Sequence, residues 1–207
     1  DWSSDVCSSD LGDVRADSVR AMVRTMFGEI PRGPAFTRPR IAPFTLRDTV
    51  VVLEDRVQLP RLTLAWHGVR EYHADDAALD IASYVLAGAR NSRLTKALVQ
   101  DRPLATNVSA FNSSKRLDGD VQIVATARPG IHLDTLQRAI DAELTRLAAE
   151  GPTTRELRQA LNSIEASFLS RLEFSSGKAD QLNAYYYATG RSEEHTSELQ
   201  SPMYLVC

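Results

Sequence analysis

A proline-rich stretch near residue 40 constrains the fold of this 207-residue chain more than any other feature. Residues 31–44 read PRGPAFTRPRIAPF and carry four prolines. Each proline fixes φ near −65° and lacks an amide donor, so this stretch can continue neither a helix nor a central strand. We therefore predict an extended inter-domain linker over residues 31–48. Its arginines are either solvated or part of an anion site.

The segment before the linker has the pattern of one amphipathic helix. In residues 16–27 the apolar side chains recur at helical spacing, and Gly28 and Pro31 follow as stop signals. The apolar face consists of Val19, Met22, Val23, Met26 and Phe27.

The segment after the linker alternates strand and helix patterns. TVVVLED (49–55) and RLTLAWHGV (61–69) are predicted strands, the second with Leu62, Leu64 and Trp66 on one face. A helix over residues 75–88 ends at Gly88, and a short helix follows at 92–100. LATNVSAF (104–111) and DVQIVATA (120–127) indicate a hairpin with a long polar loop.

The C-terminal part is predicted to be helical. Apolar residues step by three and four from Leu133 to Leu147, and Gly151 ends this helix. Thr153 and Glu156 have the spacing of a capping box, so a second helix begins there. A last helix is predicted to begin near Lys178. The residues alone thus indicate an α/β-type segment without a complete active site, long enough for one core or for one domain plus part of another.

The two ends of the chain differ from the rest. DWSSDVCSSDL (1–11) and residues 191–207, beginning RSEEHTSELQS, resemble translated sequencing adapter, and we expect both to be disordered and outside the fold. The first ten residues carry three aspartates, and residues 191–207 carry one arginine and three glutamates, so excluding them changes the net charge from −3 to +2. Both cysteines lie in these ends. The near-neutral remainder gives no nucleic-acid signal, no thiolate metal site and no membrane span.

Few side chains anywhere in the sequence have the spacing of a catalytic or metal site. Glu194-His195 resembles the end of the zinc motif HxxEH, but Arg191 occupies the first histidine position and offers no lone pair. His67 and His73 form either a joint site or two surface histidines, and His132 precedes a helix. Asp75 and Asp76 are either paired carboxylates or acids that favour a helix start, and Tyr185 to Tyr187 either pack or line a groove.

Several segments together resemble one family, the pitrilysin/insulinase family of zinc metallopeptidases. They follow the family's order and spacing through residues 12–190: GDVRADSVRAMVRTMFGEIPRGP, LEDRVQLPRLTLAW, GARNSRLTKALVQDRPLATNVSAF, VATARPG, LAAEGPTTREL and EASFLSRLE. The resemblance implies an α+β fold, a two-layer α/β sandwich of the processing-peptidase-like metallohydrolase type. In it, a mostly antiparallel sheet carries helices on one face.

The resemblance also implies a domain assignment. Residues 12–30 would end the zinc-binding half, 31–48 would be the linker, and 49–190 would be a truncated, metal-free second domain. The HxxEH motif of the zinc half would lie upstream, and the helix that stands in its place here, around Ala77–Val85, has no histidine. No catalytic or metal-ligating residue is therefore expected in this chain, and zinc would be the cofactor of the parent protein.

Three residues are expected to bind substrate on the strength of this resemblance: Arg93, Arg102 and Thr106. Many family members place an arginine and, seven residues later, a tyrosine against substrate and the developing oxyanion. Here Val99 and Thr106 occupy those two positions. Arg102 matches the pattern, and Arg93, in NSRL, is either structural or substrate-facing.

The implied function is that of the non-zinc-binding domain of a zinc endopeptidase. It would form chamber wall and peptide-docking surface, with peptide or unfolded protein and the upstream zinc domain as partners. The alternative is a non-catalytic structural core subunit related to the processing peptidases, which the missing arginine and tyrosine favour. By itself the chain is expected to be inactive and to hold no zinc. A cell-envelope or periplasmic location is expected from similar bacterial proteins, with the cytoplasm as the alternative.

Overall fold

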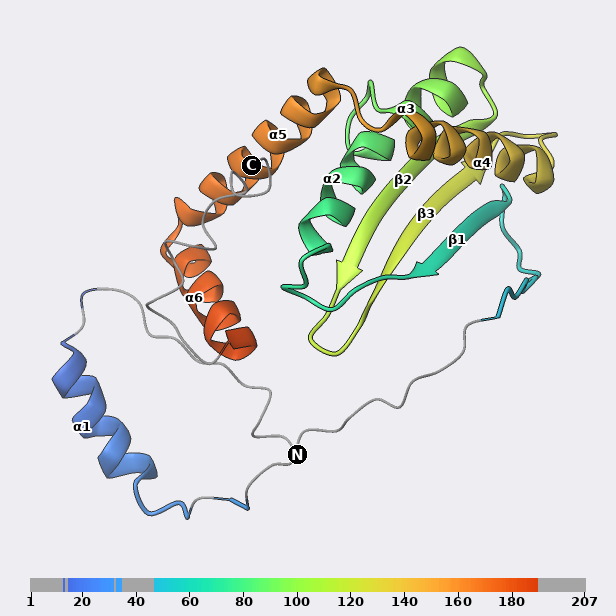
Figure 1. Cartoon of the computed structure of the whole chain (residues 1–207). Coiled ribbons are helices and arrows are strands. Elements are labelled where there is room, and N and C mark those ends of the chain that lie inside the picture. Colours follow the sequence, from blue (N-terminus) through green and yellow to red (C-terminus); the bar gives the residue numbers. More distant parts are fainter. Residues whose placement is uncertain (1–12, 14, 32, 35–46, 190–207) are drawn as a thin grey trace. The chain divides into compact units, whose positions relative to one another are not determined.

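The computed structural model describes residues 13, 15–31, 33–34 and 47–189 (Figure 1). They belong to two compact units. One is Val50–Phe168, and the other combines residues up to Thr49 with residues from Leu169 onwards. The adapter-like segments 1–11 and 191–207, and residues 35–46 of the linker, lie outside the described residues.

Two helices lie in the second of these units. Helix α1 spans Ala16–Phe27 and ends at Gly28, as predicted, and none of its residues is buried. Helix α6 spans Ser175–Thr189, so its predicted start near Lys178 is wrong. Gly177 lies inside its first turn, where a Cβ would come 1.9 Å from the carbonyl oxygen of Arg171. The missing side chain lets the helix begin earlier than predicted.

The unit Val50–Phe168 is built on a three-stranded antiparallel sheet. Its strands are β1 (Arg61–His67), β2 (Ala105–Ser114) and β3 (Gly119–Ala127), in the order β1-β3-β2 (Figure 1). Ile123 of β3 lies between Leu64 of β1 and Ala110 of β2. Because strand side chains alternate between faces, this register puts the apolar residues of all three strands on one face.

The hairpin is tighter than its sequence suggested. Strands β2 and β3 pair as far as Ser114 and Gly119, which leaves only Lys115–Asp118 as the turn. The amide of Lys115 donates to the carbonyl of Asp118 at 2.8 Å. Asn112, Ser113 and Ser114, predicted to lie in a long loop, are paired strand residues instead, because ladder hydrogen bonds outweigh their weak strand preference.

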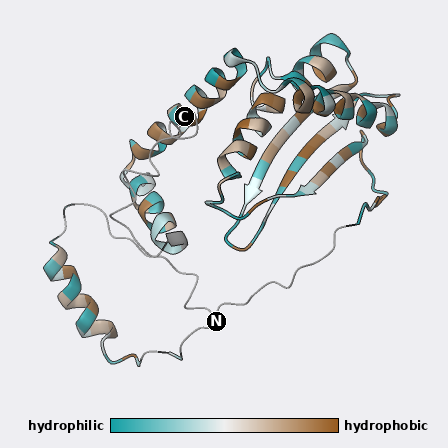
Figure 2. Cartoon of the chain, in the orientation of Figure 1, coloured by the Kyte–Doolittle hydropathy of each residue, from teal (hydrophilic) through white to brown (hydrophobic). Residues whose placement is uncertain are grey.

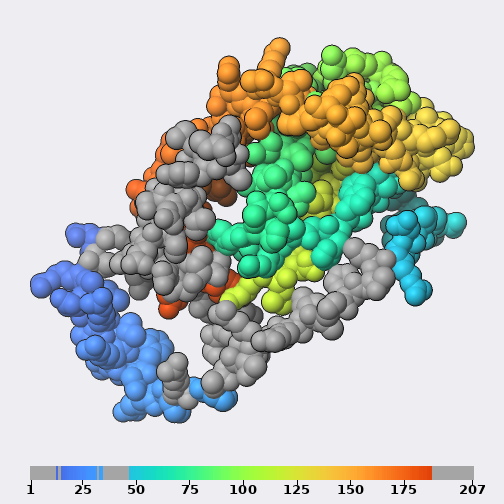
Figure 3. Space-filling view, viewed as in Figure 1, coloured from blue at the N-terminus to red at the C-terminus, as the bar shows by residue number. Residues whose placement is uncertain are grey.

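The predicted strand at 49–55 is wrong. Residues 47–57 have no helix or strand, and Val50 to Leu53 are 72–90% exposed. A strand exists only as part of a hydrogen-bonded ladder, and no described strand pairs with this run. In the space-filling view these residues lie at the surface of the unit (Figure 3).

Helices cover the apolar face of the sheet. Helix α2 (Asp76–Ala87) packs against β2, and α4 (Leu133–Glu150) packs against β1 and β3. Between α2 and β2 the short helix α3 (Arg93–Thr95) widens into a π-helical turn, η1 (Lys96–Asp101). Hydrophobic residues are frequent along α2 and β3, whereas α4 is banded with hydrophilic ones (Figure 2). This is the expected two-layer arrangement, with one helical layer on an antiparallel sheet.

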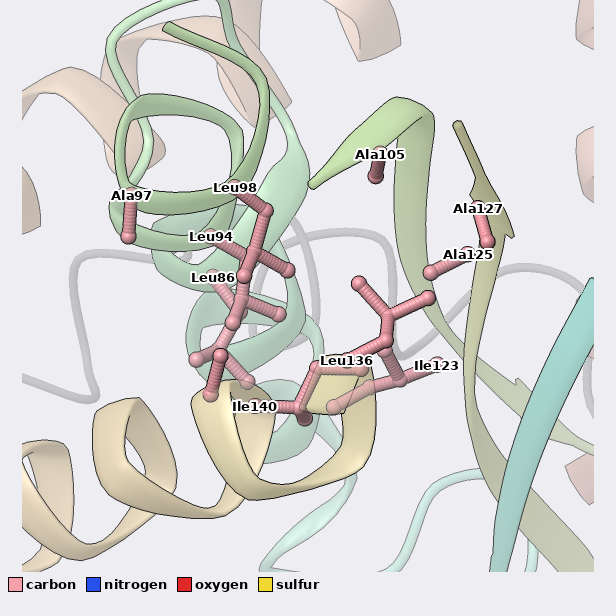
Figure 4. Packing of buried hydrophobic residues seen from close by; sticks show 11 residues of the cluster. Leu86, Leu94, Ala97, Leu98, Ala105, Ile123, Ala125, Ala127, Leu136 and Ile140 are labelled. Atoms are coloured by element: carbon pink, nitrogen blue, oxygen red, sulfur yellow. The ribbon is translucent and has the colours of Figure 1, made fainter. Parts of the chain in front are cut away.

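The core lies between these two layers. Leu94, Leu98, Ile123, Leu136 and Ile140 are the largest side chains with essentially no exposure, and they point toward one another (Figure 4). They come from α3, η1, β3 and α4, so the core joins segments that are distant in sequence. Burying each such side chain contributes about 1.5–3 kcal/mol relative to leaving it exposed.

The last helix of the domain begins as predicted. Helix α5 spans Thr154–Leu172, and Gly151, which separates it from α4, has a φ of 71°. Glycine adopts this left-handed conformation without the Cβ clash that other residues meet. The capping box is confirmed. The amide of Thr153 donates to Glu156 at 2.8 Å, and the amide of Glu156 donates to the Thr153 hydroxyl at 3.2 Å.

Candidate functional site

Arg93 is buried, and two of its three guanidinium nitrogens take part in a network under the α4–α5 turn, while its Nη1 has no hydrogen-bond partner. Only 6% of the residue is exposed. Its Nε donates to Oε1 of Glu156 and its Nη2 to Oε2, both at 2.8 Å, and Nη2 also donates to the carbonyl of Gly151 at 2.8 Å. These contacts tie the start of α3 to the start of α5. Of the two roles considered for Arg93, the geometry supports the structural one.

Glu156 is the centre of that network. Hydrogen bonds from Arg93 are the main cause that lowers the pKa of the Glu156 carboxyl to about 2; burial, the next largest effect, raises it, and hydrogen bonds from Thr153 lower it further. The carboxylate therefore stays ionised throughout the neutral range. A bidentate, partly buried arginine–carboxylate pair of this kind is among the stronger charge interactions in proteins.

Arg102 and Thr106 lie at the exposed start of β2. Arg102 follows the π-helical turn, where its amide donates to the carbonyl of Ala97 at 3.3 Å. The ladder between β2 and β3 shifts register between Ala105 and Asn107, so Thr106 occupies a bulge. Its hydroxyl donates to the carbonyl of Thr126 on β3 at 3.2 Å. A bulge at a strand start re-aims the neighbouring side chains.

The three residues expected to bind substrate do not form one site. Arg102 and Thr106 are both exposed and lie four residues apart in sequence. Arg93, in contrast, is buried and forms an ion pair with Glu156. Val99, which stands where many relatives have an arginine, is partly buried against the core. Substrate binding by Arg93, Arg102 and Thr106 stays a prediction.

Two further arginines lie at the same end of the sheet, and sequence reasoning missed them. Arg61 begins β1 opposite Thr126, and Arg128 follows the end of β3. The Arg128 amide donates to the carbonyl of Leu104 at 2.9 Å, and its Nε donates to the carbonyl of Ala105 at 3.3 Å. The antiparallel register is the signal that could have found them, because it places the start of β1 beside the end of β3.

The histidines and acids interact with separate partners. His67 Nε2 lies 2.5 Å from Oδ2 of Asp118, and His73 Nδ1 accepts from the amide of Asp75 at 3.2 Å. The joint site considered for these two histidines is therefore not assembled. His132 is the N-cap residue of α4. Within the described residues no group of three or more His, Cys, Asp or Glu could hold a metal ion.

A polar contact links α2 to β2 at the opposite end of the sheet. The side-chain amide of Asn112 donates to Asp76 Oδ1 at 2.8 Å and to Asp80 Oδ1 at 3.1 Å. Burial raises the pKa of Asp80; the hydrogen bond from Asn112 lowers it by a smaller amount, and repulsion from Asp76 adds a still smaller increase. Asp76 lies in the first turn of α2 and also accepts from the amide of Tyr72 at 3.1 Å. Its place in the first turn agrees with an acid that favours a helix start.

The start of β2 presents the exposed side chains of Arg102 and Thr106. Among the described helices, none is long and apolar enough to cross a membrane.

Comparison with known proteins identifies the family. Residues 9–164 match the family described as the peptidase M16 inactive domain. Over 137 residues the chain is 30% identical to the zinc protease PqqE of Helicobacter pylori, which is 66% of this chain but 31% of that protein. The crystal structure of a protease from Helicobacter pylori superposes with a TM-score of 0.74 at 27% identity, over 91% of this chain and 46% of that one.

A further structure supports the fold alone. The peptidase M16 inactive domain from Pseudomonas fluorescens superposes with a TM-score of 0.68 at 18% identity, over 91% of this chain and 44% of that one. The chain thus spans less than half the length of these relatives. The resemblance to zinc metallopeptidases and the two-layer fold are both confirmed. The chain belongs to the peptidase M16 family, as an inactive, non-catalytic domain.

Proposed function

We propose that the parent protein is a zinc-dependent endopeptidase in which this domain forms chamber wall and docks an extended peptide at the start of β2. Zinc and the general base would belong to a separate, upstream domain of the parent. The relative PqqE is described as a zinc protease, which supports this reading.

The observation that carries the proposal is the exposed, bulged start of β2. No described strand pairs with the outer edge of β2, so its backbone can accept an added strand. Arg102 and Thr106 are exposed at this point, and Arg61 and Arg128 lie at the same end of the sheet. A peptide carbonyl or terminal carboxylate would find donors there.

Peptide binding to the 207-residue chain tests the docking role. A labelled, unstructured peptide without acidic side chains is titrated by fluorescence anisotropy against the wild type, Arg102→Gln and Thr106→Val. Both variants are expected to weaken binding several-fold. The control is Arg138→Gln, which removes an exposed arginine from α4. Equal affinities for all four proteins would reject docking at β2.

A second candidate is a structural core subunit related to the processing peptidases. The observation that favours it is the absence of the substrate-facing pair, since Val99 is partly buried and Thr106 carries only a short hydroxyl. The coding sequence upstream of residue 12 separates the two. HxxEH with a distal glutamate supports the peptidase, and a degenerate motif supports the core subunit.

A further inference from the structure

A shallow, open groove of mixed polar and apolar lining runs between α2 and α5. It consists of two adjoining hollows of about 310 and 690 Å³ that share Tyr84, Arg155 and Gln159 as lining residues. Lys96 lines the smaller hollow, and Arg158 and Asn162 line the larger one. We call the two hollows together the α2–α5 groove, and these six residues are the part of its lining that matters most here. All of them belong to the unit Val50–Phe168.

The groove carries three cations with no anionic partner in the described part of the chain. Lys96, Arg155 and Arg158 are exposed, and none of their side chains forms a hydrogen bond or ion pair there. The one carboxylate that lines the groove, Glu156, is already neutralised by Arg93 at 2.8 Å on both oxygens. The groove is therefore locally positive, although the chain as a whole has a net charge of −3.

Two of these cations lie at positions that are electrostatically unfavourable. Arg155 and Arg158 lie in the first two turns of α5, next to the positive end of the helix dipole. They are also three residues apart, so the like charges share one helix face. No described acid relieves this repulsion. A local conflict of this kind, without a compensating contact, is expected where residues serve binding and not stability.

The remaining lining suits a polypeptide. Asn91 and Gln159 exchange side-chain hydrogen bonds of 3.1 and 3.0 Å beside the groove, and Asn162 and Ser163 extend the polar lining along α5. Amide and hydroxyl groups can bond peptide carbonyls and amides, while half-buried Tyr84 offers an aromatic wall. Lys96 lines only the smaller hollow, Arg158 lines only the larger one and Arg155 lines both, so the cations are divided between two hollows, which favours several carboxylates over a single phosphate.

From these contacts we infer that the α2–α5 groove binds an acidic segment of another polypeptide. Lys96 would contact its carboxylates from one wall, and Arg155 and Arg158 from the other. This role is independent of peptidase activity and of peptide docking at β2, because neither needs these residues.

Binding of a labelled poly-glutamate peptide to the 207-residue chain tests the inference. It is measured by fluorescence anisotropy at low salt for the wild type and for the double variant Arg155→Gln/Arg158→Gln. The matched control is Arg70→Gln/Arg138→Gln, which removes two exposed arginines outside the groove. The groove variant is expected to bind about tenfold more weakly, with the control unchanged. Poly-glutamine of the same length is expected not to bind, and added salt is expected to weaken the wild-type complex.

Thermal unfolding accompanies the titration. The groove variant is expected to melt at the same temperature as the wild type or slightly higher, because a like-charge contact has been removed. If it unfolds instead, Lys96→Gln on the opposite wall supplies the same test without touching α5.

Three results would overturn the inference. The first is equal affinity for poly-glutamate in the groove and control variants. The second is competition by inorganic phosphate at the same concentration of negative charge, which would make this a small-anion site. The third is tighter binding of a short DNA, lost in the groove variant, which would assign the groove to nucleic acid.

Discussion

Arg93 and Glu156 lie 63 residues apart in sequence and face each other through two hydrogen bonds of 2.8 Å. The same carboxylate accepts from the amide and the hydroxyl of Thr153 at 2.8 and 2.9 Å. One side chain thus caps α5 and holds α3 beneath the α4–α5 turn. Since α3 contributes Leu94 to the core, this polar contact fixes a segment on which the apolar core depends.

Removing Arg93 is expected to destabilise the domain strongly. Arg93→Ala leaves the Glu156 carboxylate without its partner and frees the carbonyl of Gly151. Breaking one side of a fully buried ion pair costs about 3–5 kcal/mol, and because Glu156 is partly exposed we expect a smaller loss, about 2–3 kcal/mol in the free energy of unfolding. Urea unfolding followed by circular dichroism measures the change. Arg138→Ala, at an exposed position on α4, is expected to change it by less than about 0.5 kcal/mol. Similar values for the two variants would remove Arg93 from its structural role.

The Arg93–Glu156 pair is also expected to make stability depend on acid pH. Hydrogen bonds from Arg93 lower the pKa of Glu156 to about 2 from its ordinary value of 4.5. A carboxyl with a lowered folded-state pKa contributes stability above its unfolded pKa, and this contribution is lost as the pH falls from 4.5 toward 2. Because Glu156 is partly exposed, solvent screening reduces the contribution to about 1–2 kcal/mol.

The comparison of wild type with Glu156→Gln isolates this group. The difference in their free energies of unfolding is expected to be constant between pH 6 and pH 7, and to shrink steadily between pH 4.5 and pH 3. A difference that stays constant down to pH 3 would show that the carboxylate is not the titrating group.

The tight hairpin depends on Gly119. A Cβ at this position would lie 2.3 Å from the carbonyl oxygen of Val69, and the Gly119 carbonyl accepts from the amide of Gly68 at 2.8 Å. Gly119→Ala must therefore push β1 and the hairpin apart, with an expected loss of about 1–3 kcal/mol in stability. Gly33→Ala is the control, because nothing lies within 4 Å of its Cβ. Thermal unfolding measures the change. Equal melting temperatures for Gly119→Ala and Gly33→Ala would contradict this account.

Sequence patterns predicted the structural features that depend only on residues close together in the chain. The capping residues Thr153 and Glu156, the stop at Gly88 and the alternation of Leu62 with Leu64 all depend on spacing within a few residues. Each was found in the structure, since Leu62 and Leu64 pack on the core and α2 ends at Gly88. Such signals are the same in an isolated segment and in the whole fold.

Features that depend on distant partners could not be predicted in this way. The second role of Glu156 requires Arg93, and the cluster of Arg61 with Arg128 requires the register of β1 on β3. The run at 49–55 has strand composition, yet its conformation depends on whether a neighbouring strand is present. The α2–α5 groove likewise arises only when α3, α2 and α5 have packed.

The exposed apolar run Val50 to Leu53 is expected to drive self-association. These four consecutive side chains are 72–90% exposed, and their backbone has no described strand as a partner. Short apolar runs of high strand propensity associate edge to edge. The double variant Val51→Lys/Val52→Lys is expected to lower the concentration dependence of light scattering without changing the melting temperature, because neither side chain belongs to the core. The matched variant Arg56→Lys/Val57→Lys changes the exposed segment just beyond the run and is expected to scatter like the wild type. If Val51→Lys/Val52→Lys and Arg56→Lys/Val57→Lys scatter light equally, the run Val50 to Leu53 does not cause the association.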